Sequence, residues 1–122
     1  MATPFVAGSA ALLLQKNGKS PHVARRARTL FETTALAIPR NKSENSPLHS
    51  LAQAGAGLIN VYNALTLRTT LSPGELLLND TAHYQPVHRL TLHNNGQKQQ
   101  SYSIEHYPAA TANTIGSVRL VV

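Results

Sequence analysis

The stretch MATPFVAGSAALLLQ, residues 1–15, decides how the rest of the chain is interpreted. Pro4 suits the first turn of a helix, because the N–H that proline lacks would have no partner there. Gly8 and Ser9 keep one face small, so this helix can lie very close to a neighbouring backbone. The segment is apolar almost all round, which predicts a buried helix that Gly18 ends as a cap. The apolar residues at helical spacing are Val6, Ala7, Ala10, Ala11 and Leu14.

A second helix is predicted in SPHVARRARTLFETTA, residues 20–35. Ser20 is a suitable N-cap, and Pro21 suits the first helical position. The arginines lie mainly away from the apolar stripe, so we expect the basic run to be a solvated helix face. The stripe consists of Val23, Ala27, Leu30 and Phe31, and the basic run of Arg25, Arg26 and Arg28.

The next segment, PRNKSENSPLHS at residues 39–50, is polar and contains two prolines, which predicts a surface loop. QAGAGLINVYNAL follows at residues 53–65. Gly55 and Gly57 permit a tight approach of backbone to backbone. The apolar residues after them predict a short helix that ends the α-helical part of the chain.

From about residue 68 the apolar period changes from that of a helix to two. We expect a strand in ELLLND (75–80) and a hairpin with Asn95-Gly96 as its two-residue turn. Leu90 and Leu92 would lie on one strand of this hairpin, and Tyr102 and Ile104 on the returning strand. GSVRLVV (116–122) is expected to form one more strand. The chain is therefore predicted to be an α-helical piece joined to an incomplete β-sandwich.

Composition limits the chemistry that the chain can carry. Hydrophobic residues make up 42% of the 122, which is compatible with a packed core. No apolar run is long enough to span a membrane, and no cysteine is present, so disulfides and thiol nucleophiles are excluded. The formal charge of +6 makes anionic surfaces or nucleic acid conceivable partners.

Met1-Ala2-Thr3-Pro4, followed by Val6, Ala7 and Gly8, resembles the segment after the nucleophilic serine of subtilisin-like serine proteases (subtilases, peptidase family S8). That family reads Gly-Thr-Ser-Met-Ala-x-Pro and then a buried helix. Residues 20–35 resemble the next helix of the fold, and residues 53–65 the segment that closes the catalytic domain, except that Ala54 separates Gln53 from Gly55. Residues 72–84, 91–98 and 101–112 resemble the fibronectin type III-like sandwich of large secreted subtilases.

The resemblance implies an α/β subtilisin-like catalytic domain of which residues 1–67 are only the C-terminal helices. Residues 68–122 would begin an all-β fibronectin type III-like sandwich. The parent would be a secreted endopeptidase that hydrolyses protein and peptide substrates through a Ser-His-Asp triad. Its serine would immediately precede Met1, with Asp and His further upstream. We therefore assign no catalytic residue to this chain and expect the chain alone to be inactive. Met1, Ala2, Thr3, Pro4 and Gly8 would support the serine's position.

The resemblance implies no cofactor in this chain, although calcium is common among subtilases. The chain's partners would be the missing N-terminal catalytic part and the remainder of the sandwich; we expect no nucleic acid partner and no membrane span. The sandwich would keep an open strand edge. Without its parent sheet, the helical part would expose an apolar patch that favours association. The residues of this patch are Val6, Leu12, Leu13, Leu14 and Phe31.

Other candidate sites are weighed against ordinary structural roles. Ser9 lacks the strained elbow of a nucleophile, and we expect it to pack within the helix. His83, His88 and His93 have no common zinc spacing, so we expect sandwich positions and no metal. Asn41 and Asn79 match the N-glycosylation pattern, in agreement with a secreted parent. The alternative function is a non-catalytic basic binding or interaction module, which would fold by itself.

Overall fold

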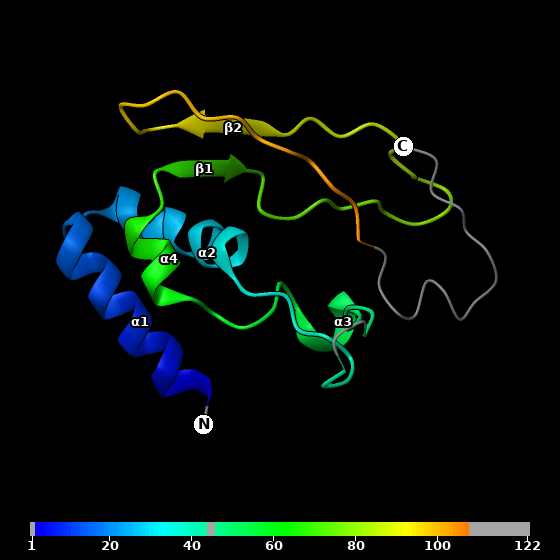
Figure 1. The fold of residues 1–122 in the computed structure, drawn as a ribbon, viewed down its shortest axis with the longest axis horizontal. Helices are drawn as coiled ribbons and strands as arrows, with labels where there is room; N and C mark the ends of the chain where they lie inside the picture. Colours follow the sequence, from blue (N-terminus) through cyan, green and yellow to red (C-terminus); the bar gives the residue numbers. More distant parts are fainter. Residues whose placement is uncertain (1, 44–45, 108–122) are drawn as a thin grey trace. The chain divides into compact units, whose positions relative to one another are not determined.

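The computed structural model describes residues 2–43 and 46–107 (Figure 1). Two compact units are distinguished, and each is described by itself. The first comprises residues 2–34 and 59–100, and the second comprises residues 35–58, without 44 and 45, and residues 101–107. The expected domain boundary between residues 67 and 68 falls inside the first unit. The strand expected at residues 116–122 lies outside the described residues, as does Met1.

The first unit contains three helices. Helix α1 spans Ala2–Asn17, α2 spans Pro21–Thr34 and α4 spans Val61–Thr66. The predicted caps are confirmed at the start of α2, where the Val23 N–H donates to Ser20 Oγ at 3.3 Å. Gly18 follows α1 with a φ of 94°, a conformation that residues with a side chain rarely adopt.

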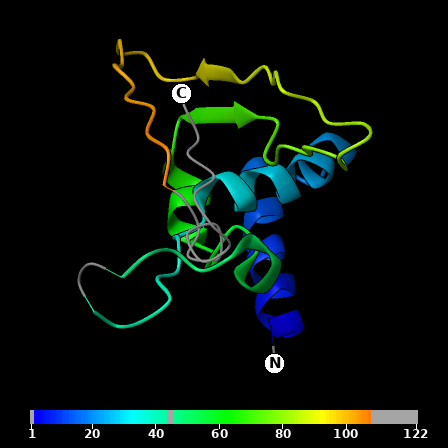
Figure 2. The ribbon, with the colours of Figure 1, turned by 90° about the vertical axis from the view of Figure 1, so that its right-hand side faces the viewer.

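A two-stranded antiparallel sheet completes the first unit. Strand β1 is Thr69–Ser72, and β2 is Thr91–Asn94, with Leu71 opposite Leu92. Both views place β1 over α2 (Figures 1 and 2), and α2 contacts β1 directly. The backbone bond from Asn95 N to Arg68 O at 2.9 Å extends the pairing by one step.

The predicted strands are wrong in two places. Residues 75–80 form no strand, and the partner of β2 is β1 instead of a strand after the Asn95-Gly96 turn. The Asn94 side chain explains part of this difference, because its Oδ1 accepts from Gly96 N at 2.9 Å and its Nδ2 donates to Lys98 O at 2.8 Å. These bonds close a wider turn than the expected two-residue hairpin. Residues 101–107 lie outside any strand.

The hydrophobic core of the described residues is small. Its buried apolar side chains are Leu13 on α1 and Ala64 on α4, and α1, α2 and α4 all contact one another. The first helix is not buried in this chain, because Phe5, Val6 and Leu12 of α1 are each about half exposed. The exposure of Val6 and Leu12 agrees with the apolar patch predicted for the helical part without its parent sheet. Leu13 is 1% exposed, so its expected place in the apolar patch is wrong. Leu14 and Phe31 are half-buried.

The second unit contains a short helix, α3 (Leu51–Ala54), and two isolated antiparallel bridges. Leu36 and Leu58 exchange both backbone hydrogen bonds, each at 2.8 Å. Pro39 pairs with Leu48 and so closes the base of the predicted loop, whose residues 41–43 are exposed as expected.

Candidate functional site

The residues of the subtilase-like motif lie on the first half of α1. Ala2, Thr3 and Pro4 are exposed in its first turn, and Met1 is outside the described residues. A Cβ atom added at Gly8 would meet no atom within 4 Å. The close helix packing that the sequence predicts at Gly8 is therefore absent from the described part of the chain.

Ser9 has the packing role that the sequence predicts. Its side chain is 3% exposed, and its hydroxyl donates to the Phe5 carbonyl at 2.8 Å, one helical turn earlier. This arrangement satisfies a buried hydroxyl within its own helix.

The structure pairs one histidine with a carboxylate, which the sequence reasoning missed. In the exposed turn after Asn79, Asp80 Oδ1 lies 3.0 Å from His83 Nδ1 and also accepts from the His83 backbone N–H at 2.8 Å. The backbone bond, then the side-chain bond, holds the pKa of Asp80 below its ordinary value of 3.8. An aspartate three residues before a histidine in a polar segment is the only signal for this pair.

His83, His88 and His93, which the sequence spaces five residues apart, have separate surroundings in the structure. His88 Nε2 lies 2.9 Å from the carbonyl of Gln85, and His93 lies on β2. Within residues 2–43 and 46–107, no three His, Asp or Glu side chains gather as a metal site would require.

Both predicted glycosylation acceptors lie on the surface. Asn41 is exposed in the loop of the second unit. Asn79 is exposed with a φ of 61°, and its Nδ2 donates to the carbonyl of His83 at 3.3 Å. Both acceptor residues are therefore exposed, and the Asn79 side-chain nitrogen also supports the local turn.

The arginines of α2 divide into two groups that the sequence alone did not separate. All three are exposed, as predicted. Arg28 Nε donates to Glu32 at 2.7 Å, and its Nη2 donates to Glu75 at 3.1 Å. The hydrogen bond and charge of Glu32, then the charge of Glu75, raise the pKa of Arg28. Arg28 thus joins α2 to the segment after β1.

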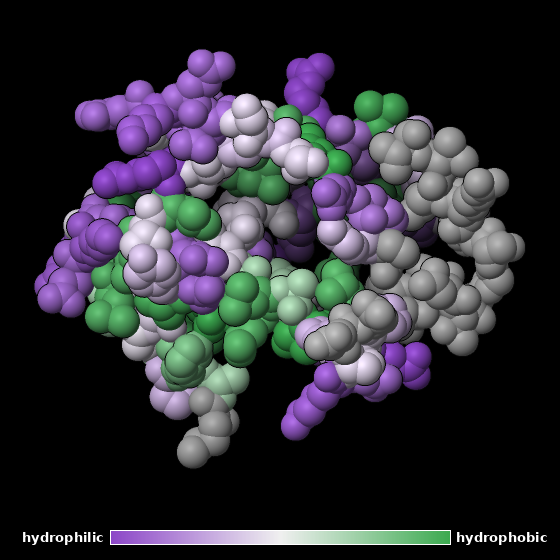
Figure 3. All heavy atoms as spheres, viewed as in Figure 1, coloured by the Kyte–Doolittle hydropathy of each residue, from purple (hydrophilic) through white to green (hydrophobic). Residues whose placement is uncertain are grey.

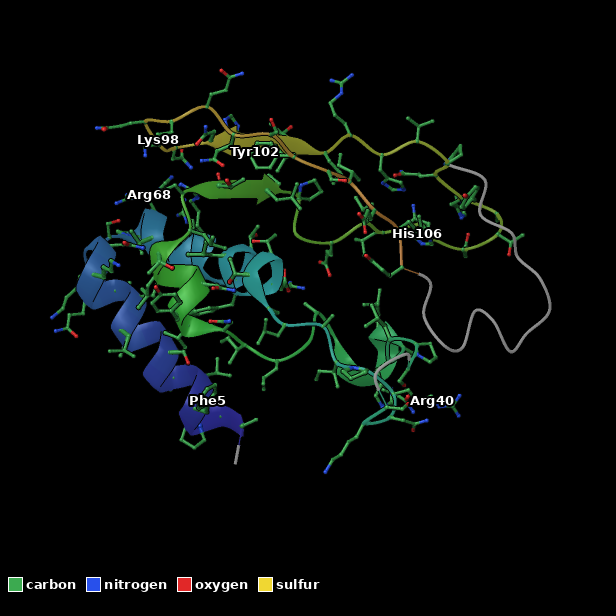
Figure 4. The ribbon with its side chains drawn as sticks, in the orientation of Figure 1. Phe5, Arg40, Arg68, Lys98, Tyr102 and His106 are labelled. Carbon is green, nitrogen blue, oxygen red and sulfur yellow. The ribbon has the colours of Figure 1, made fainter. Side chains whose placement is uncertain are left out.

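Arg25 and Arg26 instead line a groove of about 770 Å³ in the first unit. Arg68, which precedes β1, and His93 of β2 reach the same groove from one end of the paired strands, and His22 reaches it from the start of α2. Arg68 and Lys98 lie at the same end of the sheet (Figure 4), where hydrophilic residues gather on the surface (Figure 3). Sequence reasoning missed this groove because it brings together segments more than 40 positions apart.

Comparisons of the chain with known protein families, with curated proteins and with solved structures find no match. Among the described helices, none combines the length and apolar character needed to cross a membrane.

Proposed function

We propose that this chain is the C-terminal segment of a secreted subtilisin-like serine endopeptidase, joined to the start of a fibronectin type III-like domain. The observation that carries the proposal is the motif Met1-Ala2-Thr3-Pro4 with Gly8, followed in the family's order by the segments at 20–35 and 53–65. In the parent, a serine hydroxyl would attack the peptide carbonyl and form an acyl-enzyme, while histidine takes its proton and aspartate orients the histidine.

The role of this chain would be to support that chemistry. Helix α1 begins at Ala2, so in the parent its free backbone N–H groups and positive dipole end would face the serine that the resemblance expects before Met1. The large apolar side chains that α1 exposes agree with a helix that another part of the parent covers. Ala2, Thr3, Pro4 and Gly8 would fix this helix and thereby the serine.

The decisive experiment labels the protein in its source with a fluorophosphonate probe that reacts with active-site serines. The protein is then captured with an antibody raised against residues 18–28 and digested with trypsin. We expect the label on a serine immediately before Met1, in the peptide that ends at Lys16. Recovery of an unlabelled peptide that begins at Met1, from a protein of 122 residues, would contradict the proposal.

A second candidate function is a non-catalytic basic binding module, which the groove lined by Arg25, Arg26 and Arg68 favours. Such a module must fold by itself. A cooperative thermal melt together with monomeric sedimentation of the 122-residue chain would favour it over the protease segment. Association or a broad, uncooperative melt would count against it.

A further inference from the structure

The groove of the first unit carries an excess of positive charge. Arg25, Arg26 and Arg68 line it together with His22 and His93, whereas no Asp or Glu is among its lining residues. Three guanidinium groups therefore share one concave surface without a carboxylate. Such a surface attracts an anionic ligand at long range and can pair with it at contact.

The neighbouring carboxylates do not neutralise this charge. Glu32 and Glu75 both bind Arg28, at 2.7 and 3.1 Å. Within the described part of the chain, Arg25, Arg26 and Arg68 form no ion pair with an acidic residue. Since a guanidinium fork suits a carboxylate geometrically, these three side chains are available for carboxylates from outside the chain.

The rest of the groove surface selects among anionic ligands. Its apolar lining is aliphatic, and among the described residues no Phe, Tyr or Trp lines it. Proteins that bind single-stranded nucleic acid stack bases on aromatic rings, which this groove lacks. Aliphatic side chains instead suit the leucines, valines and isoleucines of a peptide. The aliphatic lining residues are Leu13, Val23, Leu30, Ala64, Leu65, Leu67 and Leu71.

We propose that this groove binds an acidic peptide segment that carries aliphatic side chains. Its carboxylates pair with Arg25, Arg26 and Arg68, and its aliphatic side chains contact the leucines of the groove. The inference rests on the second candidate function and is independent of the protease proposal.

The test measures binding of a fluorescein-labelled peptide of alternating Glu and Leu, nine residues long, by fluorescence anisotropy. The triple variant Arg25→Gln, Arg26→Gln, Arg68→Gln is expected to bind about tenfold more weakly, because it loses three exposed charge pairs that each contribute modestly. The matched control, Lys19→Gln, Arg89→Gln, Lys98→Gln, removes the same net charge from exposed positions outside the groove. Circular dichroism verifies that both triple variants keep the helix content of the unaltered 122-residue chain.

The possible outcomes distinguish acidic-peptide binding in the groove from the basic binding module on which this inference rests. Groove-specific loss, and weaker binding of a peptide of alternating Glu and Ser, support the inference. Equal loss in the two triple variants overturns it, because net charge alone then explains the binding. Groove-specific binding of an oligothymidylate but not of the peptide overturns the acidic-peptide partner and leaves the basic module. No binding of any anion overturns both.

Discussion

Among the glycines that the structure describes, Gly57 is the one that tolerates a side chain least. Its φ is 116°, and an added Cβ would lie 2.1 Å from the Leu36 carbonyl oxygen. The two segments joined by the isolated bridge between Leu36 and Leu58 would therefore have to separate. We expect Gly57→Ala to destabilise the pairing of Leu36 with Leu58 by about 1–3 kcal/mol. Amide hydrogen exchange at Leu36 and Leu58 should then become about 5- to 150-fold faster.

Gly8→Ala is the matched control, because a Cβ at Gly8 meets nothing within 4 Å and the residue lies inside α1. Alanine should stabilise this helix by about 0.5–1 kcal/mol. Unchanged exchange at Leu36 and Leu58 in Gly57→Ala would contradict the close approach. The sequence predicted a close approach at both Gly55 and Gly57. The structure confirms it only at Gly57, since a Cβ at Gly55 meets nothing within 4 Å.

Asp80 should titrate below the ordinary aspartate range. Because its pKa is lower in the folded chain, the bonds to His83 stabilise the turn fully at pH values above the unfolded-state pKa of about 3.9. This stabilisation is lost as the pH falls through the lower folded-state pKa. A carbon-13 NMR titration of the Asp80 carboxyl group should give a midpoint below 3.8.

In His83→Ala the midpoint should rise only part of the way, because the larger contribution comes from the backbone N–H, which remains. His88→Ala is the control and should leave the midpoint unchanged, since His88 contacts the Gln85 carbonyl instead. If the Asp80 carboxyl group of the unaltered chain titrates with a midpoint at or above 3.8, the Asp80–His83 contact does not persist in solution.

At the scale of elements, α4 depends on its N-cap because it has only six residues. Asn60 Oδ1 accepts from the Asn63 N–H at 2.9 Å. Asn60→Ala should cost about 1 kcal/mol of helix stability, seen as roughly fivefold faster amide exchange at Asn63 and Ala64. Asn60→Asp keeps the acceptor and should retain the slow exchange; equal exchange in the alanine variant would argue against the cap.

The helices of the first unit could be predicted from the sequence, whereas of the sheet only a strand around Leu92 could be predicted and its pairing could not, for a physical reason. Ser20, Pro21 and Gly18 act within one helical turn of the residues that they cap, so local sequence contains the signal. A strand needs a partner, and the partner of β2 lies about 20 residues earlier, in TTLS, a segment too short to show a period of two. The pairing across Leu71 and Leu92 is invisible until the chain is folded.

The candidate groove belongs to the scale of the whole first unit. The sequence correctly placed Arg25 and Arg26 on an exposed helix face, but it gave no reason to join them with Arg68. That proximity follows from β1 packing on α2, which is a long-range contact. The sequence also could not show that Arg28 binds Glu32 and Glu75. Those two carboxylates are therefore not paired with the arginines that line the groove.

The exposed apolar side chains of α1 predict how the isolated chain behaves. Phe5 and Leu12 are 55% and 50% exposed, and Phe5 lies near the N-terminal end of the helix (Figure 4). Among the described apolar residues, only Leu13 and Ala64 are buried. We expect the chain to associate at micromolar concentration, because burial of such side chains is favourable by about 1.5–3 kcal/mol each.

Phe5→Ser with Leu12→Ser should shift sedimentation toward the monomer. Val87→Ser with Ile104→Ser is the control, since these side chains are even more exposed but lie outside α1. If the control pair restores the monomer equally well, association has no preference for α1. If the unaltered chain is a monomer with a cooperative melt, the apolar face of α1 needs no cover, and the basic module becomes the better account of this protein.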